Sequence, residues 1–106
     1  MKLHVTLPNG SNRELEGKTG RSVMEVMRDG GIPIRAECGG AMACASCHVV
    51  VDDAWMARTG TASDDEGDLL GGSDYRVAGS RLSCQIPMTQ ELDGLKVALQ
   101  LDAFEG

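Results

Sequence analysis

The chain has 106 residues, a length that accommodates one domain and leaves no room for a second. Its 16 acidic and 10 basic residues give a net charge of −6, and this sign disfavours binding to DNA or RNA. The apolar runs are far shorter than the roughly 20 residues that a membrane-spanning helix needs, so we expect no membrane insertion.

The N-terminal residues predict a hairpin. Residues 2–7 alternate apolar and polar side chains, which is the pattern of a half-buried strand. Asn9 and Gly10 tolerate the positive φ angles of a tight turn, and residues 13–16 predict the returning strand.

A helix follows the hairpin. Ser22 and Glu25 have the spacing of a capping box, in which the serine caps the helix and the glutamate reaches back to it. Gly30 and Gly31 predict the end of this helix. Two strands and a helix that lead into a ligand-binding loop are typical of the start of a β-grasp fold.

The four cysteines of the chain suggest that such a loop comes next. Three lie within ten residues and the fourth is remote, with gaps of five, two and 36 residues: Cys38, Cys44, Cys47 and Cys84. Thiolates hold iron–sulfur clusters in sets of four, and the plant-type two-iron spacing is four, then two, then a long gap. The loop 38–47 is rich in glycine and alanine, which lets the backbone curl closely around a small inorganic core.

Other uses of four cysteines fit less well. Structural zinc prefers two short knuckles, whereas only Cys44 and Cys47 form one here. Two disulfides would suit a short secreted chain, but no signal-peptide pattern is visible and the small residues of the loop would be unexplained. A structural zinc module is the more distant alternative that stays open, beside ordinary buried thiols.

Residues 48–51 predict a short β-branched strand directly after the loop. His48 follows Cys47, and we expect it to hydrogen-bond to the segment around Ser80 rather than to ligate iron, because all four cysteines are present. Arg81 is expected to form an internal ion pair or hydrogen bond near Cys84. Residues 94–101 alternate again and predict the final strand.

Residues 52–74 hold the whole net charge of the chain. They contain seven acids and one base, which gives −6, while the remaining residues carry nine acids and nine bases. Ser63 and Glu66 again have capping-box spacing and predict a short acidic helix that ends at Gly71. Residues 57–63 predict a surface loop, and Trp55 is expected to pack. Acids in a first helical turn complement the helix dipole, but that explains only about two of them. A patch of one sign steers charged partners.

The cysteine spacing, with Glu37-Cys38-Gly39-Gly40, Cys47-His48 and residues 80–86, resembles two-iron ferredoxins of the adrenodoxin/putidaredoxin type. The resemblance covers essentially the whole chain. It implies a one-electron carrier between a flavin-dependent NAD(P)H ferredoxin reductase and an oxygenase, with a cytochrome P-450 preferred. A ring-hydroxylating dioxygenase and cluster assembly are the alternatives.

The same resemblance implies that the acidic helix is the recognition surface for reductase and oxygenase, and it carries onto Asp64, Asp65, Glu66 and Asp68. Family members can also use a C-terminal aromatic residue to contact the oxygenase. Phe104 is near the end of this chain but is not its last residue, so the resemblance gives little support for the same role here.

We therefore predict a single α+β domain of β-grasp type over residues 1–106, with a mixed sheet, one main helix, a short acidic helix and a cluster-binding loop near the surface. One [2Fe-2S] cluster is expected on Cys38, Cys44, Cys47 and Cys84. The protein should be a monomeric electron carrier and not an enzyme. Thiols committed to a cluster favour a reducing bacterial cytoplasm, with a mature mitochondrial form as the alternative.

Overall fold

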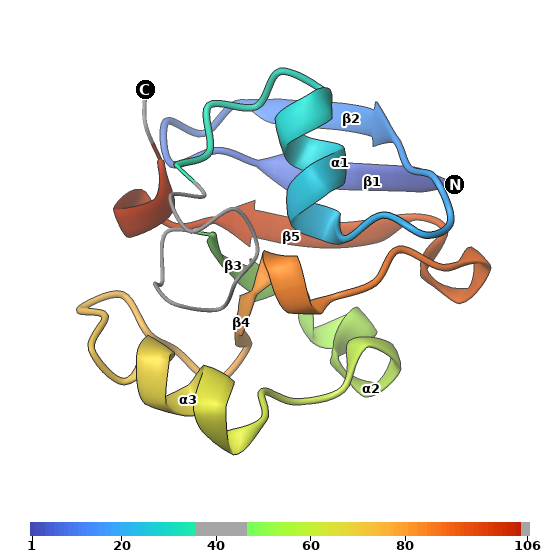
Figure 1. Ribbon diagram of the computed structural model, residues 1–106. Helices are drawn as coiled ribbons and strands as arrows, with labels where there is room; N and C mark the ends of the chain where they lie inside the picture. Colours follow the sequence, from blue (N-terminus) through green and yellow to red (C-terminus); the bar gives the residue numbers. More distant parts are fainter. Residues whose placement is uncertain (36–46, 105–106) are drawn as a thin grey trace.

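The computed structural model of the protein describes residues 1–35 and 47–104 (Figure 1). Its strands are β1 (Lys2–Thr6), β2 (Asn12–Glu16), β3 (His48–Val51), β4 (Ser80–Leu82) and β5 (Leu95–Leu99). Its helices are α1 (Val23–Asp29), α2 (Met56–Thr59) and α3 (Asp64–Leu70), with short 3-10 turns η1 (Asp53–Trp55), η2 (Ser83–Gln85), η3 (Gln90–Leu92) and η4 (Leu101–Ala103).

The strands form one mixed sheet in the order β2-β1-β5-β3-β4. β1 pairs with β2 in antiparallel fashion and with β5 in parallel, and β3 is antiparallel to both β5 and β4. The first and last parts of the chain thus meet at the centre of the sheet. This arrangement confirms the predicted α+β fold with a mixed sheet.

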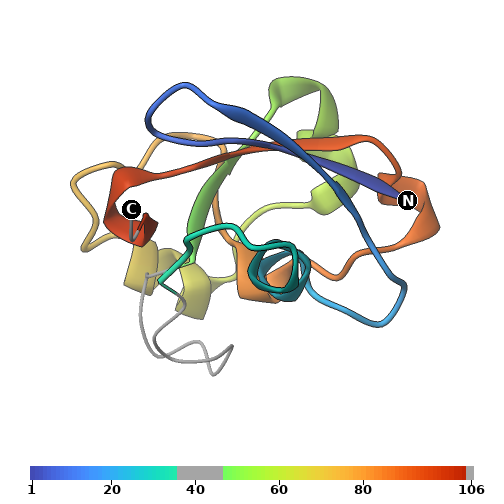
Figure 2. The same cartoon turned by 90° about the horizontal axis from the view of Figure 1, so that it is seen from above.

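Helix α1 covers one face of the sheet (Figures 1 and 2). Its capping box is complete, because the Ser22 hydroxyl accepts the Glu25 backbone N–H at 3.1 Å and the Glu25 carboxylate accepts the Ser22 N–H at 3.0 Å. Gly31 follows the helix with φ of +83°, which favours glycine. The helix buries an apolar face against the inward side chains of the sheet: Val23, Met24, Val26 and Met27 against Leu3, Val5, Leu95 and Val97.

The prediction of a surface loop over residues 57–63 is wrong for residues 57–59, which are helical. Residues Met56–Thr59 form α2, which follows directly on η1. Local contacts support this turn of helix: the Asp52 carboxylate accepts the Ala54 N–H at 3.0 Å, and the Arg58 guanidinium lies 5.0 Å from the centroid of the Trp55 ring. Trp55 also packs against the hydrophobic core, as expected.

Within residues 1–35 and 47–104, no helix combines the length and the apolar character that crossing a membrane would require.

Candidate functional site

Two of the four cysteines lie side by side at one end of the β3–β4 pair. Cys47 directly precedes β3 and is 1% exposed, while Cys84 lies in η2 and is half-buried. The antiparallel register that pairs His48 with Leu82 brings the two segments together. Cys38 and Cys44, predicted as the other ligands, lie outside the described residues.

Ser83 holds this arrangement in place. Its backbone N–H donates to the Cys47 carbonyl at 3.1 Å, and its hydroxyl donates to the same oxygen at 2.7 Å. The Gln85 amide lies 3.5 Å from the Cys84 sulfur as a further donor. Two hydrogen bonds from Ser83 therefore connect the turn that carries Cys84 to Cys47, the last residue of the cluster loop.

The chemistry of this thiol pair fits a metal centre. The hydrogen bond with the Cys84 thiol, together with burial, raises the pKa of the Cys47 thiol well above its ordinary value. A cysteine ligates iron as the thiolate and not as the thiol, so a bound cluster would displace this proton and supply the positive charge that stabilises the thiolate. Two cysteines can ligate the same inorganic core only if their sulfur atoms lie close together, and the hydrogen bonds of Ser83 hold Cys47 and Cys84 in such an arrangement.

His48 makes the contact that its position beside Cys47 predicted. The imidazole is completely buried, and its Nε2 lies 2.7 Å from the Ser80 hydroxyl. Its Nδ1 lies 3.1 Å from the Asp102 carboxylate, a partner that the sequence did not indicate. The histidine thus connects β3, the start of β4 and the C-terminal segment.

Arg81 forms the internal ion pair expected of it, and its partner is Glu66. The Arg81 Nε lies 2.7 Å from Glu66 Oε2, and the Leu82 backbone N–H donates to the same carboxylate oxygen at 2.8 Å. The other side of the guanidinium donates to the carbonyls of Thr59 and Gly60 at 2.9 and 3.1 Å. One arginine therefore ties β4 to both α2 and α3.

The prediction that Glu66 belongs to the docking surface is wrong for this reason. The residue is 2% exposed, so it cannot reach a partner. The second capping box is also only half formed: the Ser63 hydroxyl accepts the Glu66 N–H at 3.3 Å, but the carboxylate turns inward to Arg81. The sequence signal that could have indicated this is the apolar residue Leu70, which lies four residues later on the same helical face and is buried.

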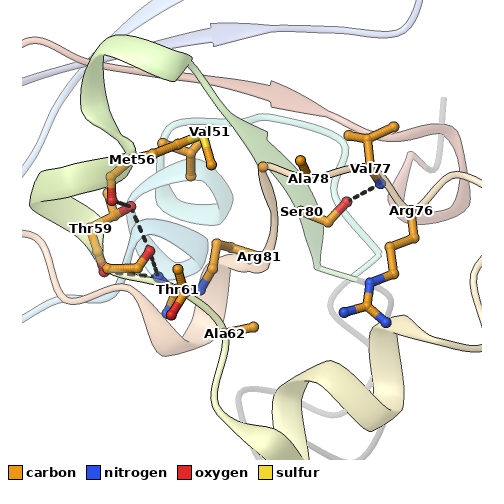
Figure 3. Close-up of a pocket in the computed structure, with 12 residues that line it drawn as sticks. Val51, Met56, Thr59, Thr61, Ala62, Arg76, Val77, Ala78, Ser80 and Arg81 are labelled. Carbon is orange, nitrogen blue, oxygen red and sulfur yellow. Dashed lines mark hydrogen bonds between the residues drawn. The ribbon is translucent and has the colours of Figure 1, made fainter.

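The other acids predicted for docking are exposed on α3: Asp64, Asp65 and Asp68. Arg76, which lies just beyond the acidic segment, interrupts this face, because its guanidinium donates to the Gly67 carbonyl at 3.3 Å. Figure 3 shows Arg76 and Arg81 around a surface hollow of about 400 Å³ between α2 and the loop before β4. The acidic surface therefore carries a fixed positive charge at one side.

Comparison with known proteins identifies the family. The family described as the 2Fe-2S iron-sulfur cluster binding domain matches residues 6–89. The chain belongs to this two-iron ferredoxin family. The ferredoxin binds one [2Fe-2S] cluster and is an electron carrier rather than an enzyme.

Relatives narrow the branch. The 2Fe-2S ferredoxin CtmE from Castellaniella defragrans is 45% identical over 100 residues, which cover 92% of this chain and 94% of the relative. A ferredoxin structure from Rhodopseudomonas palustris HaA2 is 38% identical with a TM-score of 0.92, over 97% of this chain and 99% of that one. Putidaredoxin in a covalent complex with putidaredoxin reductase is 38% identical with a TM-score of 0.88, over 93% and 97%. The ferredoxin is therefore of the adrenodoxin/putidaredoxin type.

Proposed function

We propose that this ferredoxin carries single electrons from a flavin-dependent NAD(P)H reductase to an oxygenase, through a cluster ligated by four cysteines: Cys38, Cys44, Cys47 and Cys84. The observation that supports the ligand set most directly is the contact between Cys47 and Cys84, which are separated by 36 residues and brought together by β3–β4 pairing. The bound cluster supplies the one-electron chemistry, and the chain supplies burial, hydrogen bonds and a surface for partners.

A reductase as electron donor is supported by the likeness to putidaredoxin, whose complex with its reductase is known. For the acceptor we propose a cytochrome P-450, on the resemblance to this branch of ferredoxins. Turnover in a system reconstituted with a reductase and either a P-450 or a ring-hydroxylating dioxygenase tests this choice. Substrate oxidation with the dioxygenase alone would contradict it.

The exposed acids of α3 are proposed to steer the partners. Asp64, Asp65 and Asp68 are exposed and lie within the segment that holds the net charge of the chain. Electrostatic attraction raises the association rate without requiring a large interface, which suits a shuttle that must bind and leave two proteins in turn.

Neutralising these three residues with Asp→Asn substitutions should slow reduction by putidaredoxin reductase, used as the probe, by about tenfold or more at low ionic strength. The rate constant is measured by stopped-flow bleaching of the cluster absorbance. The difference from wild type should shrink near 1 M salt, where the screening length falls to about 3 Å.

A matched control removes three exposed acids elsewhere: Asp29→Asn, Glu14→Gln and Glu91→Gln. It changes the net charge equally but leaves α3 intact, so its rate should stay close to wild type. Equal slowing in both triple variants would mean that net charge, and not this surface, controls association.

A further inference from the structure

The hydrogen bonds of His48 form a network that connects the strand after Cys47 to two surface segments. Nε2 contacts Ser80, Nδ1 contacts Asp102, and the Ser73 hydroxyl donates to the other oxygen of the Asp102 carboxylate. Ser73 lies in the loop between α3 and β4, and Asp102 lies in η4. Both segments lie at the same side of the molecule in Figures 1 and 2.

The surrounding groups assign the protons of this network. Each serine oxygen accepts a backbone N–H from its own loop, at 2.8 Å for Ser80 and 3.1 Å for Ser73. The Ser80 proton is then available to His48 Nε2, and the Ser73 proton goes to Asp102. His48 Nδ1 must carry the hydrogen that is donated to the carboxylate. Within the described part of the chain, the Asp102 carboxylate thus lies within hydrogen-bond distance of two side chains, His48 and Ser73.

We propose that Asp102 is a positioning residue for electron transfer, which holds His48 behind Cys47 and lowers the reduction potential of the cluster through its negative charge. This inference rests on the proposed function, in which Cys47 is a cluster ligand. Groups that orient the residues around a metal centre, and the net charge near it, are both known determinants of potential. The Asp102 side chain is 25% exposed, so water screens its charge only in part.

Asp102→Asn in the cluster-loaded protein should shift the midpoint potential to a more positive value. The variant removes one negative charge, while the amide oxygen can still accept the hydrogen of His48 Nδ1. Asp74→Asn is the matched control, because it removes the same charge from an exposed residue next to Ser73 whose side chain makes no hydrogen bond within residues 1–35 and 47–104. Its shift should be clearly smaller.

Iron is assayed before each redox titration, so that potentials are compared only between samples with full clusters. If Asp102→Asn does not retain the cluster, Ser73→Ala decides the question: it keeps the carboxylate but removes a donor that spreads its charge, and the potential should become more negative. Equal shifts in Asp102→Asn and Asp74→Asn, or an unshifted potential in Ser73→Ala, would overturn the inference. A Cys47→Ser variant that kept a normal cluster would instead overturn the ligand assignment.

Discussion

Cys47→Ser and Cys84→Ser should each lose the [2Fe-2S] cluster that the wild-type chain binds. Changes in residues that merely support metal ligands cost about 10–100-fold in metal affinity, and the loss of a ligand should cost more. Because the two thiols are in contact, serine at either position removes one ligand from the same side of the cluster. Iron and sulfide content and visible absorbance measure the loss.

Ser83→Ala separates ligation from support. It removes the hydroxyl that donates to the Cys47 carbonyl at 2.7 Å, but the Ser83 backbone N–H still donates to the same oxygen. We expect this variant to retain its cluster with weakened affinity. Cys38→Ser and Cys44→Ser apply the same assay to the predicted ligands outside the described residues. A cysteine variant with wild-type iron content and spectrum would remove that residue from the ligand set, and stoichiometric zinc in the wild-type protein would contradict the assignment as a whole.

Arg81→Met should destabilise the folded protein by about 3–5 kcal/mol, the usual cost of removing one partner from a buried ion pair. The Glu66 carboxylate is 2% exposed and would keep only the hydrogen bond from the Leu82 N–H. The Thr59 carbonyl would also lose the donor from Arg81, and among the described residues the Gly60 carbonyl would keep only the Thr59 hydroxyl as a donor. The shift in the urea midpoint, followed anaerobically by circular dichroism and cluster absorbance, measures the effect.

Two further variants show whether the pair itself is responsible. Asp65→Asn changes an exposed acid next to Glu66 and should shift the urea midpoint far less than Arg81→Met does. The double variant Glu66→Gln/Arg81→Met should be more stable than Arg81→Met alone, because the glutamine carbonyl can still accept the Leu82 N–H and no charge is left buried. Strictly additive losses would show that the two side chains do not act as a pair.

Several features of this ferredoxin were predictable because they are encoded within a few residues of one another. Cysteine spacing indicates how many thiolates one loop can present, and Ser22 with Glu25 forms its capping box inside a single helical turn. The alternation of apolar residues predicted β1 and β5, whose inward side chains build the core. The location of the net charge is likewise a property of the sequence alone.

The tertiary structure decided which polar residues face inward. Glu66 has the same spacing from Ser63 as Glu25 has from Ser22, yet it turns to Arg81, 15 residues away, because β4 places a buried guanidinium beside α3. The bond between His48 and Asp102 spans 54 residues and exists only because η4 returns to the start of β3. Local sequence determines the backbone preference of a short segment. The partner of a polar side chain depends on which distant segment the sheet places next to it, because burial makes an unpaired charge too costly to leave alone.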